Sequence, residues 1–168
     1  YRDLSDFNSA MWKDEDLAGK TILLWAEQGL GDTLQFIRYA PLVAKMSASV
    51  IVECNPILHQ LIAEMPGVDE VVGQNHGQGY DLHFPLMSLP LKYGVSYGSH
   101  HFPYLTPPTV MDLGTRQGLR VGLNWAGNPE HARDQERSRR LSEFASLTAI
   151  PNIEFYSLQI GPASAQLA

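Results

Sequence analysis

The feature that most constrains the fold is an uninterrupted apolar segment of strand length, followed at once by glycines and a helical pattern. Residues 21–26 (TILLWA) show no alternation of polar and apolar side chains, which is typical of a parallel strand buried on both faces. Gly29 and Gly31 follow, and a helix is expected from about Thr33 to Met46, with a kink at Pro41. This order of elements predicts an α/β domain.

A second unit of the same kind comes next. Residues 49–54 (SVIVEC) form a second apolar run, and Pro56 stands where the first turn of a helix over residues 57–64 would begin. Two successive β-α units indicate a parallel sheet. Short strands are also expected at residues 70–72 and 80–84.

These signals divide the chain into four segments. Residues 1–20 are polar and acidic and are interpreted as a lead-in segment, and residues 113–118 are interpreted as a linker rich in glycine. Between them, residues 21–112 are predicted to form a three-layer, Rossmann-like domain with a parallel sheet. Residues 119–168 are predicted to begin a second Rossmann-like domain, with strands at about 119–125 and 153–159, a loop at 127–140 and a helix at 141–149.

Composition excludes several classes of protein. The chain has 168 residues, 44% of them hydrophobic, and 18 acids against 12 bases give a net charge of -6, so binding to nucleic acid is not expected. The single cysteine, Cys54, excludes an internal disulfide and fits no zinc spacing, which favours a reducing, cytoplasmic location. No clustered acids suggest a metal site, and no apolar run is long enough for a transmembrane segment. Because the chain begins without Met or a signal-like stretch, it is interpreted as part of something longer.

Basic residues are concentrated in one region. Half of the bases, all of them arginine, lie within residues 116–140, namely Arg116, Arg120, Arg133, Arg137, Arg139 and Arg140. A guanidinium group can bind a phosphate or a carboxylate with two parallel hydrogen bonds. The alternative is a solvated segment in which these arginines pair with Glu130, Asp134 and Glu136.

The first candidate site is the segment that follows the strand at 21–26. Glu27 and Gln28 lie at the strand end, and on a helix Asp32, Gln35 and Tyr39 would share one face, with Arg38 adjacent. Asp32 fits a general base that takes a proton from a hydroxyl, or else an ordinary acid in the first turn of a helix. His83, after a separate strand, fits either a substrate contact or a structural histidine.

A dinucleotide site is the weaker explanation of the same segment. The Rossmann fingerprint needs a third glycine three residues after Gly31, where the chain has Leu34. Asp32 also places a carboxylate where a pyrophosphate would sit. In favour of NAD, Glu53 lies at the end of the second strand, like the ribose-binding acid of that fingerprint.

The second candidate site is the loop after the strand at 119–125. Ala126, Gly127 and Asn128 are small residues that allow close approach, and the loop to Ser138 supplies backbone N–H groups and guanidinium groups. This combination suits a diphosphate.

Four runs of sequence carry a resemblance to a known family. The runs at residues 18–21 (AGKT), 25–42 (WAEQGLGDTLQFIRYAPL), 81–90 (DLHFPLMSLP) and 121–129 (VGLNWAGNP) resemble the glycosyltransferase-type domain that follows tetratricopeptide repeats in many bacterial proteins. That domain is similar to the ADP-heptose heptosyltransferases and, more distantly, to O-linked N-acetylglucosamine transferases. The resemblance extends from about Asp16 to the C-terminus.

The resemblance implies the GT-B architecture, in which two Rossmann-like domains face a cleft. It implies transfer of a sugar from a nucleotide-sugar donor to an acceptor hydroxyl on a protein, glycan or lipid-linked molecule, with no cofactor besides the donor and with tetratricopeptide repeats upstream. Asp32 matches the proposed base. The substrate-binding and donor-phosphate positions would be Glu27, Gln28, Gly29, Gly31, Gln35, Arg38 and His83, and Gly127, Asn128, His131, Arg137 and Ser138.

Two departures from the family pattern matter. Arg139 and Arg140 stand where the family more often has small or apolar residues, and the second domain ends after roughly one β-α-β unit. The chain alone is therefore expected to be inactive. The alternative from another class is a non-catalytic module that binds a glycan or a peptide on the same fold.

Overall fold

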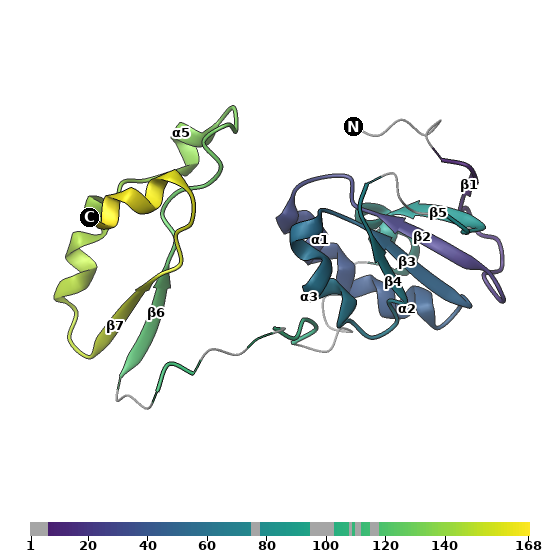
Figure 1. Cartoon of the computed structure of the whole chain (residues 1–168), viewed down its shortest axis with the longest axis horizontal. Coiled ribbons are helices and arrows are strands. Elements are labelled where there is room, and N and C mark those ends of the chain that lie inside the picture. The colour runs from purple at the N-terminus through teal and green to yellow at the C-terminus, as the bar shows by residue number, and fades with distance from the viewer. Residues whose placement is uncertain (1–6, 75–77, 95–102, 108, 110–111, 115–117) are drawn as a thin grey trace. The chain divides into compact units, whose positions relative to one another are not determined.

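The computed structural model shows an α/β chain that divides into two compact units, residues 1–111 and residues 112–168 (Figure 1). It describes residues 7–74, 78–94, 103–107, 109, 112–114 and 118–168. Each unit contains its own parallel sheet. No helix in the described part of the chain is long and apolar enough to cross a membrane.

The first unit is built on a five-stranded sheet in the order β1-β5-β2-β3-β4, with all pairs parallel. Its strands are β1 (Ala10–Met11), β2 (Thr21–Trp25), β3 (Ser49–Glu53), β4 (Glu70–Val72) and β5 (Leu82–Pro85). The central strand β2 has neighbours on both sides, so that Leu24 is paired with Val52 on β3 and with Phe84 on β5. The parallel sheet predicted from the apolar runs is confirmed.

Short helices follow the strands. They are α1 (Leu30–Phe36), η2 (Ile37–Tyr39), α2 (Ala40–Ala44), η3 (Pro56–Leu58), α3 (His59–Ala63), η4 (Leu86–Ser88) and α4 (Leu89–Tyr93), where η denotes a 3-10 turn. The helix expected over 33–46 is interrupted by η2, just before Pro41, which cannot donate a backbone hydrogen bond. Pro56 begins η3 as expected, and Asn55 caps that turn by accepting a 3.0 Å hydrogen bond from Ile57 N.

The main core lies between the sheet and these helices. Strand residues such as Leu24 and Val52 pack there with Val43 of α2 and Ile62 of α3, all fully buried. The opposite face carries a smaller cluster, formed by Phe7, Leu23, Trp25 and Ile51 with Val72 and Tyr80 at its margin. No helix of the described residues contributes to that cluster, so the described part has two layers where the sequence predicts three.

The segment expected to be a lead-in belongs to the first unit instead. Its apolar residues Phe7, Trp12 and Leu17 are buried, and β1 pairs with β5. Trp12 N donates to His83 O at 2.9 Å, and the Trp12 ring meets Phe84 edge-on at 5.4 Å. The sequence missed this because three apolar residues scattered among acids show no periodic pattern.

The second unit has a two-stranded sheet. β6 (Leu119–Leu123) pairs in parallel with β7 (Ile153–Ser157), and α5 (Asp134–Arg137), η5 (Leu141–Ala149) and η6 (Pro162–Leu167) complete the unit. The helix expected over 141–149 is present as a 3-10 helix. Among the described residues of this unit, only Trp125 and Gln159 are buried.

Candidate functional site

A pocket of about 400 Å³ lies at the carboxyl edge of the first sheet. Segments that follow three neighbouring strands meet there, because parallel strands all end at the same edge. Its lining residues are Ala26, Gln28, Gly29 and Leu30 after β2, Thr33 on α1, Cys54, Asn55 and Pro56 after β3, and Gly73 and Gln74 after β4. We call it the carboxyl-edge pocket.

The lining of this pocket mixes apolar and polar residues, and none of its described side chains is charged at pH 7. Gln28, Asn55 and Gln74 contribute carboxamides, and the Thr33 hydroxyl donates to Gly29 O at 3.2 Å. Burial, reinforced by the neighbouring Glu53 carboxylate, raises the pKa of the Cys54 thiol to about 11, so this thiol is neutral at pH 7. The pocket therefore presents hydrogen-bonding groups without charge.

Asp32 lies beside this pocket, in the first turn of α1. Its carboxylate is close to the pocket residue Gly29: a β-carbon added to Gly29 would lie only 3.8 Å from Asp32 Oδ2. The carboxylate is half-exposed and makes no hydrogen bond or ion pair with any residue that the structure describes. The N-cap of α1 is Gly29, so Asp32 is a first-turn acid and not a side-chain cap.

The other predicted substrate residues near β2 have separate environments. Glu27 Oε2 accepts a 2.8 Å hydrogen bond from Met87 N, which ties the end of β2 to η4. Partial burial raises the pKa of Glu27, and this hydrogen bond opposes the rise. Gln28 and Gly29 line the carboxyl-edge pocket, whereas Gly31 and Gln35 are exposed on α1 and are not part of its lining.

Arg38 and Tyr39 do not join Asp32 in one polar cluster. The Arg38 guanidinium lies 4.7 Å from the centre of the Tyr104 ring, and Tyr104 donates to Leu34 O at 2.9 Å. Tyr39 is buried and stacks on Tyr93 at 6.4 Å. The polar face predicted to include Tyr39 is wrong, since its ring is buried in the core while Asp32 and Gln35 are partly or fully exposed.

His83 has a structural role. It is 2% exposed, stacks on Phe7 at 3.9 Å and accepts a 3.2 Å hydrogen bond from Trp25 Nε1 at its Nδ1 atom. Of the two roles that the sequence left open, this geometry fits the structural one and leaves no surface of His83 for a substrate.

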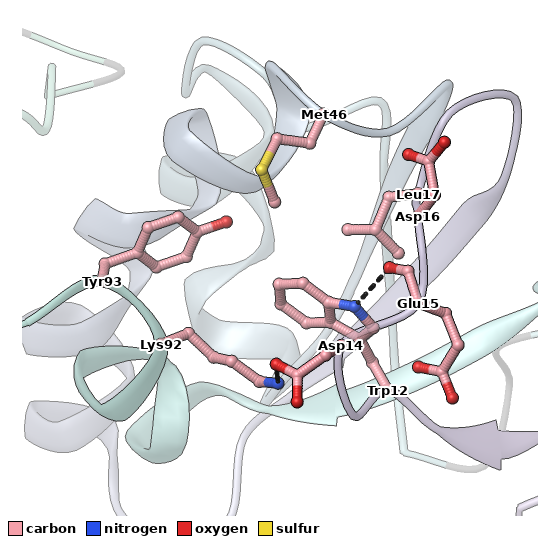
Figure 2. Close-up of a pocket in the computed structure, with 8 residues that line it drawn as sticks. All are labelled: Trp12, Asp14, Glu15, Asp16, Leu17, Met46, Lys92 and Tyr93. Atoms are coloured by element: carbon pink, nitrogen blue, oxygen red, sulfur yellow. Dashed lines mark hydrogen bonds and ion pairs between the residues drawn. The ribbon is translucent and has the colours of Figure 1, made fainter.

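A second pocket of about 510 Å³ is lined by residues from the segment 12–17, by Met46 after α2, and by the last residues of α4. Figure 2 shows its lining, formed by Trp12, Asp14, Glu15, Asp16, Leu17, Met46, Lys92 and Tyr93. Lys92 Nζ lies 2.7 Å from Asp14 Oδ1 and 4.7 Å from the centre of the Trp12 ring, while Trp12 Nε1 donates to Glu15 O. These polar groups bind one another, so they fasten the N-terminal segment to α4.

In the second unit, the predicted phosphate loop is closed by its own hydrogen bonds. Gly127 N donates to Ser138 Oγ at 2.9 Å, and Ser138 Oγ donates to Asp134 Oδ1 at 2.6 Å. Asn128 Oδ1 accepts from Glu130 N at 3.0 Å. Three of the predicted groups are thus engaged within the loop.

The arginines of this loop differ from one another. Arg133 pairs with Glu136, and its backbone N donates to Nδ1 of His131 at 3.1 Å. The charge-pair alternative therefore applies to Arg133, whereas Arg137, Arg139 and Arg140 are exposed and without an ion pair in the described part of the chain.

Gln159 is a structural residue that the sequence did not indicate. It is 8% exposed, its Oε1 accepts from Trp125 N at 3.0 Å and from Ala126 N at 2.8 Å, and its Nε2 donates to Ala126 O. The amide therefore joins the ends of β6 and β7. A glutamine just after a strand carries no signal for this role.

The candidate residues belong to two separate sets. Asp32 and the carboxyl-edge pocket are in the first unit, and the arginine loop is in the second. Within the described ranges, no group of three or more His, Cys, Asp or Glu side chains could hold a metal ion. Comparison of the chain with protein-family models, with curated proteins and with solved structures finds no match.

Proposed function

We propose that this chain is a glycosyltransferase-type domain that transfers a sugar from a nucleotide-sugar donor to an acceptor hydroxyl. The observation that carries the proposal is the Asp32 carboxylate, which is half-exposed, has no partner among the described residues, and lies beside a pocket at the carboxyl edge of a parallel sheet. Ligands of open α/β sheets bind outside that edge. The sequence runs that resemble glycosyltransferases pass through the same residues.

Asp32 is the best placed of three carboxylates near the strand ends. Glu27 is held by Met87 N, and Glu53 is 2% exposed. A base must reach the proton that it removes, and Asp32 is the one of these three carboxylates that is both partly exposed and without a hydrogen bond to any described residue. In the proposed step Asp32 takes the proton of the acceptor hydroxyl. The acceptor oxygen then bonds to the anomeric carbon, and the bond from that carbon to the nucleoside diphosphate breaks.

Charge on the leaving diphosphate needs a cationic partner. Arg137, Arg139 and Arg140 in the second unit are exposed and have no ion pair among the described residues, so that unit offers cations of the kind that bind a diphosphate. The buried position of Glu53 argues against the NAD alternative, because a ribose-binding acid must be accessible.

One observation favours the non-catalytic binding module as a second candidate. Gly127 N–H and Ser138 Oγ already bind each other or Asp134, so donor phosphates would have to open these hydrogen bonds. A module that binds only in the carboxyl-edge pocket would not need to open them.

The decisive experiment is Asp32→Asn in the longest natural protein that contains this chain. With UDP, GDP and ADP sugars and a panel of acceptors, we expect the release of nucleoside diphosphate to fall by about 10²-fold to 10⁴-fold. Glu64→Gln, which neutralises an exposed carboxylate at the C-terminal end of α3 and outside the pocket lining, is the matched control and should leave the rate unchanged. Equal rates for both variants would remove Asp32 from the mechanism. Sugar binding without any release of diphosphate would favour the binding module.

A further inference from the structure

The lining of the carboxyl-edge pocket also indicates what kind of acceptor it binds. Resting on the proposed function, we propose that this pocket is the acceptor subsite and that it selects a neutral carbohydrate over an acidic one. The inference is argued from the carboxamides of the lining and from the absence of a charged side chain among its described residues.

Carboxamide side chains match sugar hydroxyls. Each carboxamide offers two N–H donors and a carbonyl acceptor, and each hydroxyl can both donate and accept. Gln28, Asn55 and Gln74 bring this chemistry from the ends of three different strands. An acidic or phosphorylated sugar is bound most strongly beside a cation, and none of the described lining side chains is a cation.

The fold fixes the hydrogen-bonding direction of two lining groups. Asn55 Oδ1 accepts from Ile57 N, so the fixed amide keeps its N–H groups for a ligand. The Thr33 hydroxyl gives its proton to Gly29 O, so its oxygen is left as an acceptor. The pocket therefore holds an oriented donor and an oriented acceptor, as binding of a hydroxyl group requires.

Electrostatics act against an anionic ligand at this place. Residues 1–111 contain six of the bases and twelve of the acids, so the whole net charge of -6 falls on the first unit. The closest accessible carboxylate is that of Asp32, beside Gly29 at the pocket wall. A carboxylate or phosphate on the acceptor would be repelled, and a neutral acceptor would not.

The size of the pocket sets the size of the ligand. About 400 Å³ is near the lower end of the range for small-molecule sites, which fits one or two sugar residues. Leu30 and Pro56 supply apolar surface for the C–H groups of a sugar ring.

The test is a titration of the isotope-labelled chain with matched sugars, followed by backbone amide shifts. The pairs are glucose with glucuronate and galactose with galacturonate, without any donor. We expect the neutral sugar of each pair to bind at least about fivefold more tightly and to shift amide signals at residues 28–33, 54–55 and 73–74. Added salt should reduce the difference in affinity between the two sugars, because it screens the repulsion of the anion. Tighter or equal binding of the uronates, or no shift by any neutral sugar at these residues, would overturn the proposal. Binding of a neutral serine peptide in place of the sugars would also overturn it.

Two variants make the test specific to this pocket. Gln74→Lys adds a cation to the lining and should move the preference toward the uronate by about fivefold, while Gln60→Lys places the same charge on exposed α3 and should not. Asn55→Asp keeps the oxygen that caps η3 but removes the N–H donors, so all sugar binding should weaken while the fold persists. Since no donor is present, these results do not depend on whether transfer occurs.

Discussion

The two units of the chain use the same kind of strand and bury it to very different extents. Four of the five residues of β2 are buried, whereas β6, of equal length, has no buried residue. Every one of the fully buried large side chains belongs to the first unit. In the described part of the second unit, the buried residues are Trp125 and Gln159.

The difference shows that an apolar strand is buried only where neighbours cover it on all sides. β2 lies between β3 and β5 and under a layer of helices, while β6 pairs with β7 alone. Two strands by themselves give marginal stability in water. We therefore expect the first unit to be the stable part of the chain, and the predictions below test this contrast.

The largest expected effect is a core truncation in the first unit. Leu24→Ala removes a side chain that is fully buried on the central strand and should lower the free energy of unfolding by about 2–5 kcal/mol. Leu119→Ala, on a strand residue of the second unit that is 61% exposed, should cost less than about 0.5 kcal/mol. Amide hydrogen exchange, read separately on β2 and β6, measures both. An equal loss of stability in Leu119→Ala and Leu24→Ala would show that the two units do not differ in how much their strands contribute to stability.

The next effect concerns Gln159, the one buried polar residue among those described in the second unit. Gln159→Met leaves Trp125 N and Ala126 N without their acceptor and should destabilise that unit by about 1–3 kcal/mol. Exchange should rise on β6 and β7 and stay unchanged on β2 and β3.

Gln159→Glu is the control for this prediction. It keeps an acceptor for Trp125 N and Ala126 N, but at pH 7 it turns a buried carboxylate oxygen toward Ala126 O and Ile160 O. It should therefore also destabilise the unit at pH 7, and should recover stability at low pH, where the protonated carboxyl again has a donor. Faster exchange on β2 in either variant would mean that the units do not unfold independently.

The same contrast explains which parts of the fold could be predicted from sequence. Continuous apolar runs identified β2 and β3, and their order along the chain predicted a parallel sheet. The number of layers could not be predicted, because the cover of the second face comes from Phe7, far along the chain from the strands it covers. Such long-range packing leaves no periodic signal in the segment itself.

Site prediction had a similar limit. The glycine-rich turn after β2 located Gln28 and Gly29 at a real pocket, since a strand end is recognisable locally. Asn55 and Gln74 were missed because they reach the pocket only through the order of β3 and β4 in the sheet. His83 was ambiguous because one histidine after a strand does not reveal its neighbours, here Phe7 and Trp25.

A smaller effect compares one ion pair in each unit. Lys92→Met keeps the aliphatic stem but loses the contact with Trp12 and the pair with Asp14, and should cost about 0.5–1 kcal/mol. Arg133→Met removes a pair with Glu136 in which both side chains are mostly exposed, so its cost should be close to zero. Chemical denaturation followed on each unit distinguishes the two. A larger cost for Arg133→Met would show that the second unit relies on surface charge.

The smallest expected effect is a pH dependence at the end of β2. Because partial burial raises the pKa of Glu27 in the folded state, protonation of this carboxyl favours the fold. Its contribution is fully present below the unfolded pKa and is lost as the pH rises through the folded one. Glu27→Gln keeps an oxygen to accept from Met87 N and stays neutral, so it should be more stable than the parent chain at pH 7. We expect a gain of less than about 0.5 kcal/mol, since the side chain is only partly buried and solvent screens its charge. The difference should disappear at pH 3, where both side chains are neutral. Hydrogen exchange on β2 between pH 3 and pH 7, with β6 as the internal reference, measures this difference in stability. A variant that is less stable than the parent chain at pH 7 would show that the charged carboxylate stabilises its contact with η4.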